Sequence, residues 1–111
     1  YPVFCIPAAQ ATAADPSSFG IVLGGSGNGE QIAANKVKDV RAALVWSVET
    51  AKLAREHNDA NVICLGQRVL GSELAALILR SYVESTFAGG RHETRVGKIN
   101  VIDEQARSVS S

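Results

Sequence analysis

The sequence has no excess of either charge and no long apolar run, and each absence excludes a class of protein. Its 11 basic and 11 acidic residues give a net charge of zero. Proteins that bind nucleic acid or a membrane surface usually carry a basic excess, so neither partner is expected here. No apolar run approaches the roughly 18–20 residues that cross a bilayer, and the first residues do not read as a signal peptide. Any anion site must therefore be local, built from a few arginines placed together.

Cysteine is also scarce. Cys5 and Cys64 lie in apolar surroundings and show neither Cys-x-x-Cys nor Cys/His metal spacing. We interpret them as buried, reduced thiols of a cytoplasmic protein rather than as a disulfide or a metal site. The 111 residues have the size of one domain, and 46% hydrophobic content is ordinary for a globular protein. The chain does not begin with Met, which leaves open that it belongs to a longer protein.

Apolar runs that alternate with helical patterns predict an α/β fold. The predicted helices cover residues 1–14, 30–37, 48–57 and 73–84, and the predicted strands cover residues 19–23, 42–46 and 62–65. Ser47 and Ser72 are the expected N-caps of the third and fourth helices, and Glu49 favours the start of the third. Cys64 is expected in the core. Trp46 is expected either in the core, which we favour, or in the wall of the site. A polar segment after Gly89-Gly90 closes the chain.

Strands that are apolar along their whole length indicate a parallel sheet with helices on both faces. In such sheets the ligand site lies at the carboxyl ends of the strands. This rule selects residues 24–29, 46–47 and 66–68 before any chemistry is considered.

The glycine-rich turn of residues 24–29 follows a predicted strand and opens a helix. Glycines bring backbone N–H groups close to a ligand, and a helix N-terminus adds partial positive charge. The dinucleotide-binding and P-loop motifs both fail, because Glu30 stands where they need glycine or lysine. A carboxylate beside oxyanion donors suits the enolisation of a sugar. A tight strand–helix connection, with Glu30 merely favouring the helix start, explains the same residues.

Four further residues are candidates for a role in the site, and three of them also have an ordinary interpretation. His57 lies at a predicted helix end, where it is either a proton carrier or a simple cap. Arg91 and Arg95 are four residues apart, and on a helix they would form either a phosphate clamp or a solvated basic face. Arg68 follows the carboxyl end of a predicted strand, which makes it a phosphate-binding candidate.

Three blocks in register resemble the type B ribose-5-phosphate isomerase family, which also includes galactose-6-phosphate isomerase. The blocks are GSGNGEQIAANK at residues 25–36, REHNDAN at residues 55–61, and GGRH at residues 89–92 followed by Arg95. The resemblance weakens after about residue 98, so residues 99–111 are expected to form a C-terminal tail of a single domain covering residues 1–111. It implies a Rossmann-like or flavodoxin-like sheet and a homodimer or homotetramer whose sites draw on two subunits.

The resemblance also implies an activity. It indicates a cofactor-independent and metal-independent enzyme of the pentose phosphate pathway that interconverts ribose 5-phosphate and ribulose 5-phosphate through an enediolate. Glu30 would be the base, Ser26 would stabilise the enediolate, and His57 would assist ring opening. In another branch of the family the base is a cysteine at the position matching Gly24, so this chain resembles the glutamate branch. The implied substrate-binding residues are Gly25, Gly27, Asn28, Gly29, Asn58, Arg68, Arg91 and Arg95.

One family feature is absent from these residues. Members begin with a strand that ends in an Asp-His pair used in substrate binding and ring opening, and that first βαβ segment would precede residue 1. With a strand order of 2-1-3-4-5 the three predicted strands would be strands 3, 4 and 5. A hexose-phosphate isomerase of the same family and a non-catalytic phosphosugar-binding module remain alternative functions.

Overall fold

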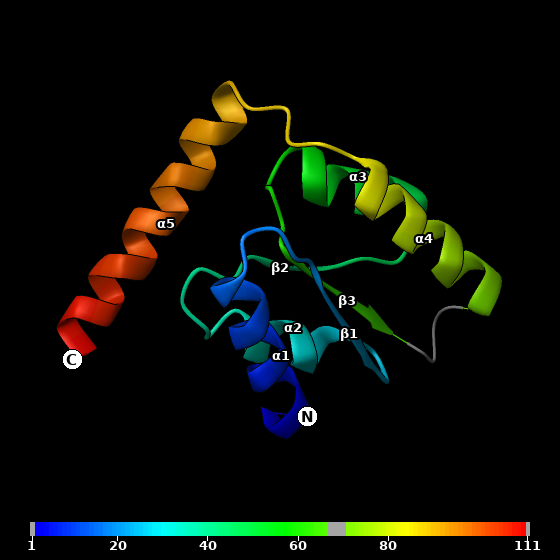
Figure 1. Ribbon diagram of the computed structural model, residues 1–111, viewed down its shortest axis with the longest axis horizontal. Helices are drawn as coiled ribbons and strands as arrows, with labels where there is room; N and C mark the ends of the chain where they lie inside the picture. The colour runs from blue at the N-terminus through cyan, green and yellow to red at the C-terminus, as the bar shows by residue number, and fades with distance from the viewer. Residues whose placement is uncertain (1, 67–70, 111) are drawn as a thin grey trace.

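The computed structural model describes residues 2–66 and 71–110, in which helices and strands alternate as expected (Figure 1). The strands are β1 (Gly20–Gly24), β2 (Ala42–Leu44) and β3 (Val62–Gly66). The helices are α1 (Pro2–Ala14), α2 (Asn28–Ala34), α3 (Val48–Glu56), α4 (Ser72–Glu84) and α5 (Arg91–Ser110). No helix in the described ranges is long and apolar enough to cross a membrane.

The three strands form one parallel sheet, in the order β1-β3-β2. Gly20 pairs with Val62, and Ala42 pairs with the same residue from the other side. The expected sequential order of these strands is therefore wrong, because the last strand inserts between the first two. β3 suits the central position because all five of its residues are buried, whereas β1 leaves Ile21 and Leu23 exposed.

Helices cover both faces of the sheet, which confirms the three-layer α/β architecture. Val62 and Cys64 point to one face and pack in a cluster that includes residues of α1 and α2. Ile63 and Leu65 point to the other face and pack with residues of α3 and α4. This alternation along a single strand is what a two-sided core requires. The burial of Cys64 is confirmed, and the side chain of Cys5 lies outside the described ones.

Helix and strand ends differ from the expected ones by a few residues. α2 begins at Asn28 and ends at Ala34, so it is shifted toward the glycine loop. Ser47 caps α3 through a reciprocal capping box with Thr50, as expected. Ser72, in contrast, is the first residue of α4, and Gly71 occupies the cap position. The expectation for Ser72 was wrong because the backbone is already helical at this residue, one position after the extended Gly71.

The expected burial of Trp46 is also wrong. β2 ends at Leu44, so Trp46 lies in the connection to α3, where its side chain is 57% exposed. β2 is an edge strand of three residues, and the sheet does not extend far enough to cover the indole.

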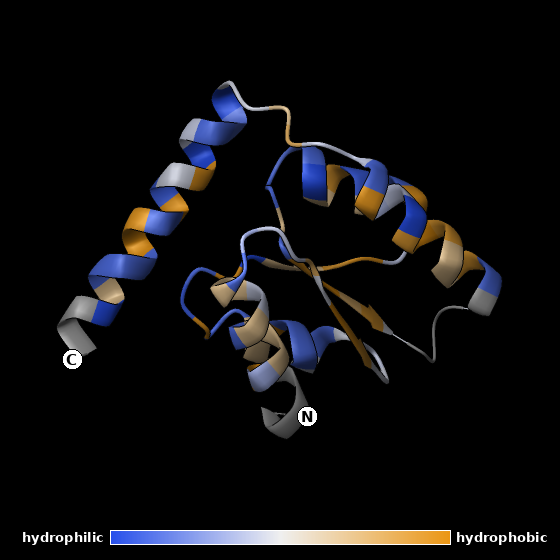
Figure 2. Ribbon diagram, in the orientation of Figure 1, coloured by the Kyte–Doolittle hydropathy of each residue, from blue (hydrophilic) through white to orange (hydrophobic). Residues whose placement is uncertain are grey.

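α5 is a long C-terminal helix that stands beside the sheet rather than on either face (Figure 1). It is linked to the residues before β2 by polar contacts, such as the Arg107 guanidinium with the Lys36 carbonyl at 3.1 Å. Residues 99–110, expected as a tail, continue this helix without a break. Apolar residues are interspersed along its exposed surface (Figure 2), among them Ile99, Val101 and Ile102.

Candidate active site

The loop that joins β1 to α2 turns tightly against the end of β3. Gly27 has a left-handed backbone, with φ of 84°, which favours glycine. A Cβ added at Gly27 would lie 2.7 Å from the Leu44 side chain, and one added at Gly66 would lie 2.6 Å from the Ser26 carbonyl oxygen. The glycines therefore allow this loop to approach the carboxyl edge of the sheet closely.

Glu30 lies in the first turn of α2 and is buried, with only 8% of its surface exposed. Its carboxylate lies directly over Gly24, so closely that a Cβ at that position would collide with it. A buried carboxylate is uncommon unless it is paired or functional. Glu30 therefore occupies the space that a side chain at position 24 would fill.

Hydrogen-bond donors lie in the same loop and at the helix start that carries Glu30. The first N–H groups of any helix have no carbonyl partner within that helix, and here they belong to residues at the start of α2. The Asn28 N–H lies 3.4 Å from the Ser26 hydroxyl oxygen, which places this hydroxyl at the same helix start. The loop thus combines a proton acceptor with several donors suited to a developing oxyanion.

A second group of candidate residues gathers at the end of α3. His57 is the C-cap of this helix, and its N–H donates to the Leu53 carbonyl at 2.9 Å. Its imidazole stacks on that of His92 in the first turn of α5, with ring centroids 4.2 Å apart and planes 9° from parallel. The Ala88 N–H donates to the Glu56 carbonyl at 2.9 Å, which fixes the segment before α5 to the same helix end.

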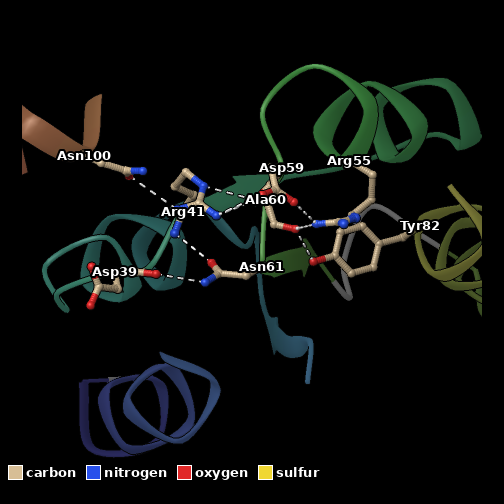
Figure 3. Close-up of polar contacts among 8 residues, drawn as sticks. All are labelled: Asp39, Arg41, Arg55, Asp59, Ala60, Asn61, Tyr82 and Asn100. Carbon is tan, nitrogen blue, oxygen red and sulfur yellow. Dashed lines mark hydrogen bonds and ion pairs between the residues drawn. The ribbon is translucent and has the colours of Figure 1, made fainter. Parts of the chain in front are cut away.

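A polar network holds the turn from α3 into β3 (Figure 3). The Asp59 carboxylate bonds the Arg55 guanidinium at 2.7 Å and the Arg41 guanidinium at 3.4 Å. Arg55 and the Tyr82 hydroxyl both donate to the Ala60 carbonyl, at 2.9 and 2.6 Å. Burial is the main reason that the pKa of Tyr82 is raised well above its usual value, so its hydroxyl stays protonated as a donor. Asp59 has a φ of 49°, which this network stabilises.

The structure does not bring the glycine loop with Glu30 and the residues at the end of α3 together within one chain. Residues 24–30 follow the carboxyl end of β1, whereas His57 and Asn58 precede the amino end of β3. β1 and β3 are parallel, and the five residues of β3 separate these edges by roughly 16 Å. Figure 1 shows α3 and the start of α5 far from the ends of β1 and β3 that carry the glycine loop.

Two of the candidate arginines, Arg91 and Arg95, lie near His57, and the third, Arg68, lies outside the described residues. α5 is helical from Arg91, so Arg91 and Arg95 are one turn apart, and both are exposed. Asn58 is exposed beside His57. Within the described part of the chain, no three His, Cys, Asp or Glu side chains gather as a metal site would require.

The sequence alone did not assign a role to His92 or Asp59. Both lie inside blocks that drew attention for their neighbours, His57 and Arg91. Nothing in their spacing shows that the start of α5 meets the end of α3, because 34 residues separate His57 from His92 in the chain. Their contacts depend on tertiary structure.

Comparisons with known proteins give matches over most of this chain. Residues 1–99 match the family model described as "Ribose/Galactose Isomerase". Ribose-5-phosphate isomerase B of Mycolicibacterium paratuberculosis is 57% identical over 97 residues, which cover 86% of this chain and 61% of that protein. The corresponding Mycobacterium tuberculosis protein is 51% identical over 108 residues, 97% of this chain and 65% of that protein.

A solved structure shows the same fold. Ribose-5-phosphate isomerase B of Clostridium thermocellum superposes with a TM-score of 0.92 at 45% identity, covering 96% of this chain and 72% of that one. The chain spans 61–65% of the length of the two mycobacterial relatives. The chain therefore belongs to the ribose/galactose isomerase family.

Proposed function

We propose that this chain is the larger part of a cofactor-independent aldose–ketose isomerase that interconverts ribose 5-phosphate and ribulose 5-phosphate. One observation carries the proposal: the buried Glu30 carboxylate lies over Gly24, the position at which another branch of the family carries a cysteine base. A base that reaches the same point from a different position in the chain suits the same reaction. The names of the relatives support the choice of substrate.

The chemistry needs one proton acceptor and a set of donors. Glu30 takes the proton from C2 of the open-chain aldose and returns it to C1, so that an enediolate forms and collapses to the ketose. Ser26 and the N–H groups of Gly27, Asn28 and Gly29 stabilise the negative charge on the enediolate oxygens. Gly25 allows the substrate to approach the backbone of the loop.

The remaining roles require a second subunit. His57, helped by Asn58, assists ring opening, and Arg91 and Arg95 hold the phosphate, with Arg68 as a further contact. His57 and the two helical arginines lie at the opposite edge of the sheet from Glu30, so they can serve only the loop of another copy. A homodimer or homotetramer with shared sites follows.

Exposed apolar residues support this assembly. Trp46 is 57% exposed and lines a cavity of about 620 Å³ between β2 and α5, together with Asn58 and Ile99. Large apolar side chains gathered beside such a cavity are typical of protein–protein contact sites. A second copy seated there would cover Trp46.

The proposed protein is a single cytoplasmic domain of phosphosugar metabolism, completed by an N-terminal βαβ segment that carries an Asp-His pair. We call residues 1–111 joined to that segment, taken from a mycobacterial relative, the completed chain. Two alternatives remain: a hexose-phosphate isomerase, since the family description also names galactose, and a phosphosugar-binding module without activity.

The test uses the completed chain and two measurements. Turnover is compared for ribose 5-phosphate and for 6-phosphorylated aldohexoses, and exchange of the C2 proton is followed in deuterated water. The proposal expects turnover and exchange with ribose 5-phosphate as the preferred substrate. Faster turnover of a hexose phosphate supports the first alternative, and binding without exchange supports the second.

A further inference from the structure

His92 has no role in the proposed mechanism, but its ring stacks on that of His57. We propose that His92 is a positioning residue, which holds the His57 imidazole in the orientation needed for ring opening. This inference rests on the proposed function, in which His57 acts on the sugar ring.

The contact is close and well defined. The planes of the two rings are 9° from parallel, and the ring centroids are 4.2 Å apart. A flat ring at this distance restricts rotation of the His57 side chain, which as a C-cap would otherwise rotate freely at the helix surface. Preorganisation of a proton-transfer group in this way favours catalysis, because misplacement by about 1 Å is costly.

The backbone around His92 is itself fixed. Gly89 and Gly90 adopt left-handed conformations, with φ of 71° and 57°, and turn the chain into α5. The His92 N–H donates to the Gly89 carbonyl at 3.1 Å, and Ala88 is bonded to the end of α3. His92 is thus presented to His57 by a short, hydrogen-bonded turn, and its position does not depend on the far end of α5.

The charge around His92 suits a neutral positioning ring. Desolvation lowers the pKa of His92 below its usual value, and His57, Arg91 and Arg95 lower it further. A neutral ring stacks without placing a second positive charge against His57.

If the stack only tied α5 to α3, its loss would have a different effect from the loss of a positioning residue. The chemistry of the substrate allows these two roles to be distinguished. Ribulose 5-phosphate is open-chain, because O5, the hydroxyl that would close a five-membered ring on C2, carries the phosphate. Exchange of its C1 hydrogen in deuterated water therefore needs Glu30 and the phosphate clamp but no ring opening. Turnover of ribose 5-phosphate needs Glu30, the phosphate clamp and ring opening.

The experiment compares His92→Ala, His92→Phe and a control, Thr94→Ala, in the completed chain. Thr94 is exposed two residues further along α5 and has no role in the proposed site. We expect His92→Ala to lower ribose 5-phosphate turnover by about ten- to a hundredfold while C1 exchange of ribulose 5-phosphate stays near normal. His92→Phe keeps a stacking ring and should restore most of the turnover, and Thr94→Ala should match the unmodified chain.

Three outcomes would overturn the inference. Turnover and exchange that fall together in His92→Ala would make the stack structural. Normal turnover in His92→Ala, or a His92→Phe variant as slow as His92→Ala, would remove the positioning role. Failure of the proposed function is distinguishable, because the unmodified completed chain would then show neither turnover nor exchange.

Discussion

At the scale of single residues, Glu30 and Gly24 constrain one another. The carboxylate fills the space above Gly24, so position 24 cannot carry any side chain while Glu30 keeps this conformation. A cysteine base at position 24 and a glutamate base at position 30 are thus alternative occupants of the same space. This exclusion gives a physical reason why the two branches of the family would use one base or the other.

The role of Glu30 predicts a specific loss. Glu30→Gln keeps the size of the side chain and the start of α2 but removes the proton acceptor. Turnover in the completed chain should fall by at least about a hundredfold, while KM changes little. The control is Glu49→Gln, which removes an exposed carboxylate from the first turn of α3. Near-normal turnover of Glu30→Gln would exclude this residue from the mechanism.

Arg91 and Arg95 predict a loss of binding rather than of chemistry. Each can donate charge-assisted hydrogen bonds to a phosphate. Arg91→Ala or Arg95→Ala should therefore weaken the binding free energy of ribose 5-phosphate by about 1.5–3 kcal/mol, which is measured as a higher KM. Any activity on unphosphorylated ribose should hardly change. Steady-state kinetics with both sugars checks this, and equal losses on both would indicate that the arginines support the subunit contact.

At the scale of elements, the turn between α3 and β3 is held by a network of hydrogen bonds and ion pairs. Its carboxylate, Asp59, lies between two guanidiniums that are mostly buried, with Arg55 exposed by 12% and Arg41 by 21%. The same turn carries His57 and Asn58 at its start. The network therefore fixes the backbone beside these two residues.

Removal of the Asp59 carboxylate should destabilise this turn. Asp59→Ala leaves both guanidiniums without this acceptor and places alanine at a positive φ, so unfolding free energy should drop by about 1–3 kcal/mol. Asp59→Asn keeps one acceptor oxygen and tolerates the left-handed backbone, so its loss should be smaller. Urea unfolding of the completed chain measures both. An Asp59→Ala variant as stable as the unmodified chain contradicts the account of the network.

Local patterns predicted most elements, because their signals are local. The Ser47 cap, the apolar strands and the glycine loop all follow from nearby residues. The order of the strands does not, because residues 19–23, 42–46 and 62–65 are similarly apolar and nothing in them shows which is central. Trp46 was misplaced for a related reason, since its exposure follows from the edge position of β2.

The candidate site divides in the same way. The loop and Glu30 could be predicted, because neighbouring residues build them. The separation of His57, Arg91 and Arg95 from Glu30 could not be derived from their spacing, because it depends on which edge of the sheet each connection reaches.

At the scale of the whole molecule, β1 is an edge strand with an uncovered face. Ile21 is 45% exposed and Leu23 is 55% exposed, and the outer edge of β1 pairs with no other strand in the described residues. Open apolar edges recruit other chains. The family resemblance implies that a strand from residues before residue 1 pairs with this edge in family members.

This edge predicts how residues 1–111 behave when they are expressed alone. They should aggregate or stay partly unfolded and show no isomerase activity, because net stability is only about 5–15 kcal/mol and falls as a domain shrinks. The completed chain should recover both folding and turnover. Thermal unfolding and a turnover assay check this, and a cooperative transition with normal turnover in the short chain would show that the extra segment is dispensable.

The most direct test of the shared site is complementation between two inactive variants of the completed chain. Glu30→Gln disables the base in every site, and His57→Ala disables ring opening in every site. If each site takes Glu30 from one subunit and His57 from its partner, a mixed dimer has one intact site and one with both defects. Unfolding and refolding an equal mixture should then restore about a quarter of the unmodified turnover, given random pairing in a two-fold symmetric dimer. If both residues serve a site within one chain, every site in every dimer keeps a defect, and the mixture will be as slow as the average of the two variants alone.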